Sequence, residues 1–247
     1  MTKLMVSDSI RAGKMAGMKA ILWDMDGTLV DTEPRWGEAT YAMAAAMGRE
    51  LTPAVRAETV GGTADGTVRR CARWAGLEPT DDEVDRWISW LYARVSVLFG
   101  QGLDLLPGVH GLLSEGRDAQ LPMMVVTNTF RSLTDQALET VGGDFFVGSV
   151  CGDEVSAGKP DPMSYLTAAR RLDVAPDDCL VFEDSTNGMR AAVAAGCRVV
   201  GLPADGAAVP EGAVPVSSLR DGRTDLSGLG LSDLHAFWEQ LGRSRVG

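Results

Sequence analysis

Residues 19–28 read Lys19-Ala-Ile-Leu-Trp-Asp24-Met-Asp26-Gly27-Thr28, a short apolar run that ends abruptly in two carboxylates and a glycine. The length and the sudden end of this run are typical of a strand buried in a sheet. Similar runs recur at 123–127, 147–151, 179–182 and 198–202, and helical patterns at 132–141, 163–172 and 187–195 lie between them. The alternation predicts an α/β fold with a parallel sheet, and residues 214–217 predict an additional edge strand.

Residues 34–103 have a different pattern. Helical periodicity covers 42–47, 67–75 and 84–98, and no convincing strand interrupts it. We therefore expect an all-helical domain of residues 34–103, inserted into a Rossmann-like α/β core formed by 18–33 and 104–220. Residues 1–17 contain no continuous apolar block, so they predict a poorly ordered lead-in rather than a secretory signal. Residues 221–247 predict a C-terminal tail with a short helix near 232–241.

Composition limits the partners of the chain. The formal net charge of −11 over 247 residues argues against a nucleic-acid partner. No apolar run approaches the roughly 20 residues of a membrane-spanning helix, so we expect no membrane partner. The four cysteines form no C-x-x-C pair, which favours the reducing cytoplasm over a disulfide framework or a zinc site. A monomer is the default expectation.

Polar residues follow the predicted strands at the sheet edge where parallel α/β folds bind ligands. They comprise Asp24, Asp26, Thr127-Asn128, Lys159 in the loop after the 147–151 run, and Glu183-Asp184-Ser185. Two carboxylates from different strands can hold Mg²⁺, and a third can attack phosphorus. The hydroxyl and the lysine can then stabilise phosphoryl charge. Lys159 is the only lysine after Lys19 in an arginine-rich chain, which suggests that a compact point charge is needed there.

These four segments, in this order, resemble the motifs of the haloacid dehalogenase-like phosphohydrolases, and the helical insertion resembles the cap of one subgroup. The resemblance implies that Asp24 is the nucleophile and a Mg²⁺ ligand, and that Asp26 is the general acid and base and offers its backbone carbonyl to the metal. It implies that Thr127, the Asn128 amide and Lys159 bind the phosphate. Asp184 would complete the metal site, with Glu183 as a further or outer ligand. The implied partner is a small-molecule phosphate ester, with a sugar or polyol phosphate preferred.

Three cap residues, Trp36, Gly62 and Thr63, are candidate substrate contacts, although Gly62 and Thr63 also fit a turn that starts a helix. Asp26 argues against a dehalogenase, and the lack of lysines between Lys19 and Lys159 argues against the phosphonate-cleaving relatives. A sugar phosphomutase is the nearest alternative, although no histidine precedes His110. A non-catalytic binding protein on the same scaffold is the alternative from another class.

Overall fold

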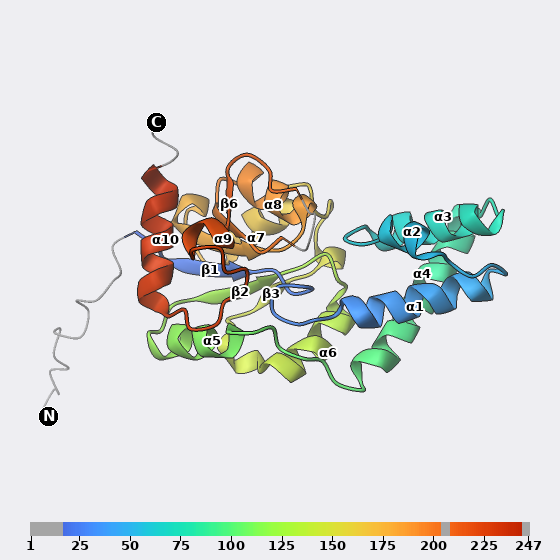
Figure 1. Ribbon diagram of the computed structural model, residues 1–247, viewed down its shortest axis with the longest axis horizontal. Helices are drawn as coiled ribbons and strands as arrows, with labels where there is room; N and C mark the ends of the chain where they lie inside the picture. Colours follow the sequence, from blue (N-terminus) through green and yellow to red (C-terminus); the bar gives the residue numbers. More distant parts are fainter. Residues whose placement is uncertain (1–16, 204–207, 244–247) are drawn as a thin grey trace, which may run out of the picture.

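The computed structural model describes residues 17–203 and 208–243, and its centre is a six-stranded sheet in the order β3-β2-β1-β4-β5-β6 (Figure 1). All neighbouring strands are parallel. The central position of β1 places residue 24 between the ends of β2 and β4. The strands are β1 Ala20–Trp23, β2 Met123–Val126, β3 Ser149–Val150, β4 Cys179–Glu183, β5 Arg198–Gly201 and β6 Ala213–Pro215.

Helices cover both faces of this sheet, because alternate side chains of each strand point to opposite sides. Ile21 and Trp23 of β1 belong to the cluster that packs against α5, α6 and α10, whereas Ala20 and Leu22 belong to the cluster under α7 and α8. The helices outside the cap are α5 Val109–Asp118, α6 Arg131–Val141, α7 Met163–Arg171, α8 Thr186–Ala194, α9 Val216–Leu219 and α10 Leu231–Arg243. Short 3₁₀ turns are η2 Gly143–Phe145, η3 Gly152–Glu154 and η4 Pro176–Asp178.

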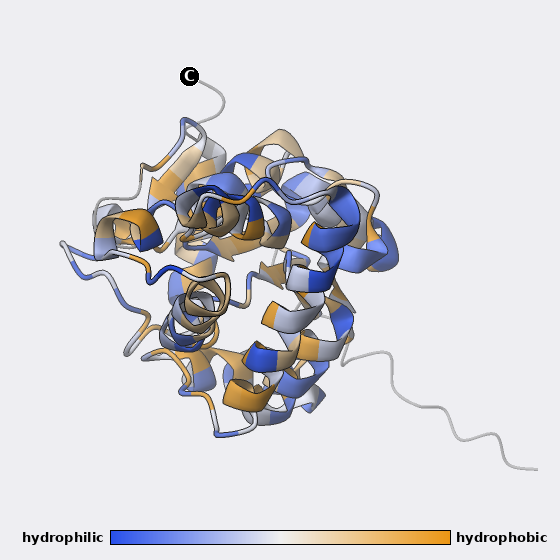
Figure 2. Ribbon diagram, turned by 90° about the vertical axis from the view of Figure 1, so that its right-hand side faces the viewer, coloured by the Kyte–Doolittle hydropathy of each residue, from blue (hydrophilic) through white to orange (hydrophobic). Residues whose placement is uncertain are grey.

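The cap consists of helices α1 to α4 and lies to one side of the sheet (Figure 1). Threonine side chains accept backbone N–H groups at the starts of α2 and α3, and Thr80 forms a capping box with Glu83 at the start of α4. Seen from the cap side, hydrophilic and hydrophobic stretches alternate along the helices, as amphipathic helices require (Figure 2). The cap helices are α1 Glu33–Ala46, α2 Pro53–Ala57, α3 Ala64–Ala75 and α4 Asp81–Phe99.

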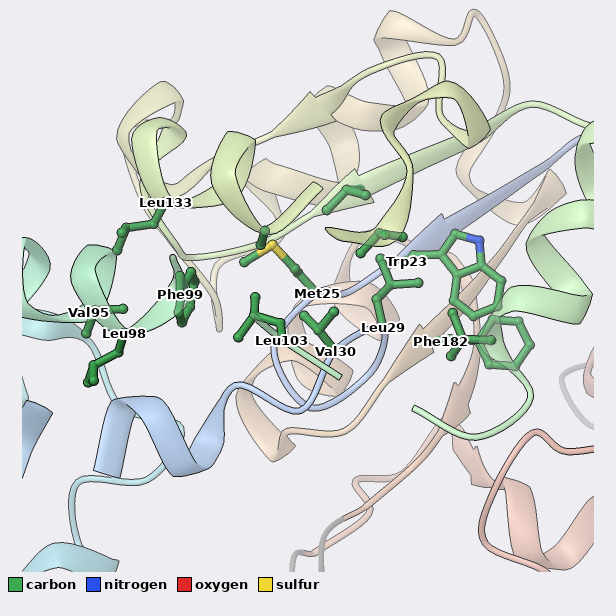
Figure 3. Close-up of a cluster of buried hydrophobic side chains, with 14 of the residues drawn as sticks. Trp23, Met25, Leu29, Val30, Val95, Leu98, Phe99, Leu103, Leu133 and Phe182 are labelled. Atoms are coloured by element: carbon green, nitrogen blue, oxygen red, sulfur yellow. The ribbon is translucent and has the colours of Figure 1, made fainter. Parts of the chain in front are cut away.

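One hydrophobic cluster runs without a break from the core into the base of the cap. It joins Trp23 and Met25 of the core with Leu98 and Phe99 at the end of α4 (Figure 3). Just before these residues in α4, Ser96 exchanges hydrogen bonds of 2.9–3.0 Å with Gln136 of α6. The end of α4 is therefore fixed to the core by both apolar packing and hydrogen bonds.

The structure confirms the predicted α/β class. The edge strand predicted at 214–217 is β6, which ends at Pro215 because the chain turns into α9 at Val216, and α10 lies where a C-terminal helix was predicted. The predicted strand at 147–151 is shortened to the two residues of β3, because the chain turns into η3 directly after Cys151. Helices α2, α5 and α9 are absent from the predicted helices. The predicted lead-in lies outside the described residues apart from Gly17. In the described ranges, no helix is both long and apolar enough to cross a membrane.

Candidate active site

The loop after β1 carries Asp24 and Asp26 at the carboxyl edge of the sheet. The N–H of Asp24 continues the sheet pattern by donating to the Phe182 carbonyl at 3.0 Å. Gly27 then adopts a φ of +81°, and a Cβ atom there would lie 2.3 Å from Oδ2 of Asp184. Glycine is therefore required at position 27 for two reasons. The left-handed backbone disfavours other residues, and the Asp184 carboxylate leaves no room for a side chain.

Lys159 is the centre of a buried charge cluster. Its Nζ donates to Asp24 Oδ1 at 2.6 Å, to Glu183 Oε1 at 2.5 Å and to the Val126 carbonyl at 2.8 Å. The side chain is only 3% exposed. Burial alone would lower the pKa of Lys159, but the Asp24 and Glu183 carboxylates raise it overall, so the ammonium stays charged. All three protons of the ammonium are used by groups at the carboxyl ends of three different strands, β1, β2 and β4.

The Glu183 carboxylate is fully hydrogen-bonded inside the protein. Oε1 accepts from Lys159 and from the Tyr165 hydroxyl at 3.1 Å, and Oε2 accepts from both the N–H and the hydroxyl of Ser185 at 3.0 Å. The carboxylate fits here because Gly188 has no Cβ, which would lie 1.6 Å from Oε1. These contacts describe a carboxylate that orients Lys159 and the start of α8.

Asp24, Glu183 and Asp184 each place a carboxylate oxygen within 4.8 Å of the others, so the three groups can hold a metal ion. Burial, followed by the Glu183 carboxylate, raises the pKa of Asp24 despite Lys159, and the same two causes raise the pKa of Asp184 to about 8. This excess of buried negative charge fits a divalent cation bound through oxygen ligands. Since the Glu183 oxygens are already occupied, Asp24 and Asp184 are the better placed ligands.

Asp26 lies in a different environment, where its carboxylate accepts from four neutral donors. Oδ1 accepts from the Thr32 hydroxyl at 2.7 Å and the Trp36 Nε1–H at 3.0 Å. Oδ2 accepts from the Thr129 hydroxyl at 2.7 Å and the Thr127 hydroxyl at 3.2 Å. Two donors come from the loop after β2, one from the end of the β1 loop and one from cap helix α1. Asp26 is thus the carboxylate at which core and cap meet.

The loops after β2 and β3 are fastened to each other next to the site. The Asn128 side chain accepts from the Lys159 N–H at 2.9 Å and donates to the Lys159 carbonyl at 3.2 Å. The Thr127 hydroxyl, besides bonding Asp26, accepts from the N–H of Thr129 at 3.0 Å. The side chain of Asn128 is therefore engaged in holding Lys159 in place.

The three predicted cap contacts have separate positions. Trp36 bonds Asp26 and packs edge-on against Tyr92 and Phe99, with ring centroids 6.0 and 6.4 Å away. Thr63 accepts from the Gly66 N–H at 3.1 Å as the N-cap of α3, as the turn interpretation predicted. Gly62 lies in the loop before Thr63, where its N–H donates to the Thr59 carbonyl at 3.3 Å. This loop comes close to the core, since a Cβ at Gly61 would lie 4.0 Å from Cβ of Ser185.

Thr32, Thr129 and Tyr165 belong to this arrangement but are absent from the predicted set. Thr129 follows the predicted Thr127-Asn128 segment, so a hydroxyl two residues further along an extended chain could have indicated it. Tyr165 lies inside α7, where its helical pattern predicts only a core position. Its hydroxyl reaches Glu183 because α7 packs against β2 and β3 with Tyr165 fully buried. Sequence spacing contains no signal for that contact.

Comparisons with known proteins agree with this geometry. The haloacid dehalogenase-like hydrolase family matches residues 18–196, and the chain belongs to that family. It is 30% identical to the phosphoglycolate phosphatase of Pectobacterium atrosepticum, over 76% of this chain and 82% of the relative. It is also 30% identical to a phosphorylated carbohydrates phosphatase of Thermotoga maritima, over 75% and 85% of the two chains.

Among solved structures, the chain is similar to CbbY from Rhodobacter sphaeroides in complex with xylulose-(1,5)bisphosphate. The TM-score is 0.76 at 28% identity, with 88% of this chain and 99% of that chain covered. The helices α1 to α4 correspond to the cap of that protein. The predicted family and the predicted enzyme type, a phosphatase of this family, are confirmed by these matches.

Proposed function

We propose that this chain is a magnesium-dependent phosphatase that hydrolyses a small phosphate monoester through an aspartyl-phosphate on Asp24. The observation that carries the proposal is the pair of contrasting carboxylates after β1. Asp24 contacts the buried Lys159 ammonium at 2.6 Å, and Asp26, two residues later, is held by hydroxyl and indole donors. One carboxylate is placed to attack, and the other to transfer protons.

In the first step, a carboxylate oxygen of Asp24 forms a bond to phosphorus, and the bond from phosphorus to the alcohol oxygen breaks. The departing oxygen takes its proton from Asp26. In the second step, water attacks phosphorus, Asp26 accepts a proton of that water, and the bond between phosphorus and Asp24 breaks. Lys159, the Thr127 hydroxyl and the backbone N–H of Asn128 would face the phosphoryl oxygens.

The donors around Asp26 indicate which of its oxygens holds the proton. An indole N–H only donates, so of the two groups at Oδ1 only the Thr32 hydroxyl can rotate and accept a proton from Asp26. Oδ2 faces two threonine hydroxyls, each of which can rotate and accept instead. We therefore assign the transferred proton to Oδ2, next to Thr129.

The proposed metal ligands are the side chains of Asp24 and Asp184 and the backbone carbonyl of Asp26. When bound, Mg²⁺ neutralises phosphoryl charge and orients the transferred group. The known relatives act on phosphoglycolate and on phosphorylated carbohydrates, as their names state, which supports a small organic phosphate as the substrate of this chain. We also propose that the cap, residues 34–103, closes over the core as a separate domain, and that the protein is a monomer.

The test is phosphate release from a panel of small phosphate esters, with Mg²⁺ or with EDTA, for wild type and Asp24→Asn. We expect Mg²⁺-dependent turnover in wild type and a loss on the order of 10³-fold or more in Asp24→Asn. Acid-quenched samples should contain a covalent phosphoenzyme in wild type alone.

Asp118→Asn is the matched control, because it makes the same change on an exposed residue at the far end of α5. This variant should retain wild-type rates. Transfer of phosphate between two positions of a sugar, without release, would instead establish a phosphomutase. Binding of an ester with neither release nor transfer would establish a binding protein.

A further inference from the structure

Glu33, the first residue of α1, lies beside the groups that hold Asp26. The hydroxyl of the preceding Thr32 bonds Asp26, and so does the indole of Trp36, three residues later on the same helix face. Burial raises the pKa of Glu33, Arg56 opposes this, and the Asp26 and Asp31 carboxylates add to the rise. The Glu33 side chain is 52% exposed, so its carboxylate is accessible to a bound molecule.

The cation nearest to Glu33 is already paired. Arg56 of α2 forms an ion pair with Glu33 and donates to the Thr59 hydroxyl at 2.9 Å, and its side chain is only 9% exposed. Its guanidinium lies across α1 at Gly37, where a Cβ would be 3.6 Å from Nη2. Because the Arg56 side chain is buried and its Nη atoms bond Thr59 and Glu33, it is not exposed to a second anionic group on a substrate, whereas the Glu33 carboxylate is half exposed.

The cap loop that approaches the core also carries no positive charge. Between Thr59 and Thr63 it consists of a half-exposed Val60 and two glycines, and Gly61 faces Ser185. The chain contains no lysine between Lys19 and Lys159. Arg70, which follows on α3, is paired with Glu58 at 2.5 Å.

Negative charge therefore surrounds the position of the leaving group. Around the reaction centre, the Lys159 ammonium and the Arg56 guanidinium face five carboxylates, which are Asp24, Asp26, Glu33, Glu183 and Asp184. With Asp26 protonated for the first step and a divalent cation bound, these charges balance, so the phosphate dianion makes the total negative. A second anionic group on the substrate would meet the half-exposed Glu33 carboxylate, whose ion-pair partner Arg56 is buried, and like charges that are partly desolvated repel each other.

We propose that this enzyme selects phosphate esters whose leaving group is neutral and hydroxylated, and that Glu33 is the residue that rejects carboxylated or bisphosphorylated substrates. The inference rests on the phosphatase function proposed above and narrows its substrate class. A carboxylate that is half exposed and oriented by Arg56 accepts hydrogen bonds from substrate hydroxyls, whereas it repels a carboxylate or a second phosphate. Rejection of anions is thus provided by the same group that recognises the polyol.

The test compares matched esters that differ in one charged group. Glycerol 1-phosphate is paired with 3-phosphoglycerate, and fructose 6-phosphate with fructose 1,6-bisphosphate. In wild type with Mg²⁺, kcat/KM should favour the neutral member of each pair by about tenfold or more. The ratio should fall as ionic strength rises, because the repulsion is screened.

Glu33→Gln should reduce that ratio to about threefold or less, mainly by raising kcat/KM for the anionic member. Glu33→Asp retains the charge and should retain discrimination, which separates charge from any loss of folding. Glu38→Gln is the matched control, because Glu38 lies on the same helix in an exposed pair with Arg94 of α4. That variant should leave the ratio at its wild-type value.

The proposal is overturned if wild type prefers 3-phosphoglycerate or the bisphosphate, or if Glu33→Gln keeps the wild-type ratio. In both cases Mg²⁺-dependent phosphate release would still stand, so the proposed function would survive. If no ester of either pair or of the wider panel releases phosphate, the proposed function fails and this inference fails with it.

Discussion

Asp24 and Asp26 are separated by one residue, yet the regions around them are built from different parts of the molecule. Asp24 is 6% exposed and contacts the Lys159 ammonium, and the groups around that pair come only from the α/β core. Asp26 accepts from two core hydroxyls, from the Thr32 hydroxyl and from the indole of Trp36 in the cap. One environment is ionic and buried, and the other is neutral and shared between core and cap.

This difference separates two tasks. The nucleophile needs an unchanging position next to a fixed positive charge, which the buried ends of strands provide. The proton-transferring group must respond to whether a substrate is enclosed, and a contact from the cap provides that dependence. We therefore expect substitutions near Lys159 to affect folding stability strongly, and substitutions near Trp36 to affect chemistry with little effect on stability.

The largest effect is expected for Lys159→Met, which removes the only ammonium from the Asp24 region. Asp24 and Glu183 would then face each other as unpaired buried carboxylates, which costs about 3–5 kcal/mol of the free energy of unfolding. Urea denaturation in EDTA measures this loss. Added Mg²⁺ should restore part of the stability by binding the unpaired carboxylates.

Lys19→Met is the matched control for that experiment. Lys19 is 55% exposed and contacts Asp178 at 2.6 Å, the same separation as Lys159 and Asp24. An exposed pair contributes only about 0–1 kcal/mol, so its removal should change stability little. If the two substitutions had similar effects, burial would not be what distinguishes the Asp24 region.

A smaller effect on the same region is expected for Tyr165→Phe. The change retains the buried ring but removes a hydroxyl that donates to Glu183 at 3.1 Å, and a hydrogen bond to a charged group contributes about 1.5–3 kcal/mol. The loss is measured by thermal or chemical unfolding, with kcat changing by less than about threefold. Tyr41→Phe on the exposed face of α1 should be neutral, and equal stability of the two variants would contradict the role of Tyr165.

Much of the Asp24 region was predictable from sequence. Apolar runs that end in Asp24, Thr127 and Glu183 mark strand ends, and parallel strands bring their ends to one edge of the sheet. The alternation of runs and helices likewise predicted the sheet, because burial on both faces makes each strand continuously apolar. β3 was overestimated because an apolar run does not reveal where an edge strand stops pairing.

The remaining contacts were not predictable because they depend on packing between segments far apart in the chain. Tyr165 reaches Glu183 only once α7 packs against β2 and β3, which brings its hydroxyl to the end of β4. Similarly, the sequence identified Trp36 as a candidate substrate contact, but not that its N–H reaches Asp26. That contact depends on how α1 leaves the β1 loop. Contacts of this kind follow from the tertiary arrangement of the helices, which local sequence periodicity does not predict.

The smallest expected effect, and the one specific to the Asp26 region, is that of Trp36→Phe. This variant keeps an aromatic ring against Tyr92 and Phe99 and removes one of the four donors to Asp26. We expect the variant to lose about 1.4 kcal/mol of transition-state stabilisation, which is a tenfold fall in kcat/KM. Its free energy of unfolding should fall by less than about 1 kcal/mol. Alkyl phosphates should show the full loss, because their leaving oxygen needs the Asp26 proton.

By contrast, p-nitrophenyl phosphate has a leaving group that departs without a proton, so its kcat/KM should fall by less than about threefold. Trp90→Phe, at an exposed tryptophan of α4, is the control and should leave both substrates unaffected. Equal losses for both esters in Trp36→Phe would show that Trp36 acts on the position of the cap as a whole rather than on Asp26. In that case proton transfer would depend on core groups alone, and Thr129, the nearest donor to Oδ2 at 2.7 Å, would be the residue to vary.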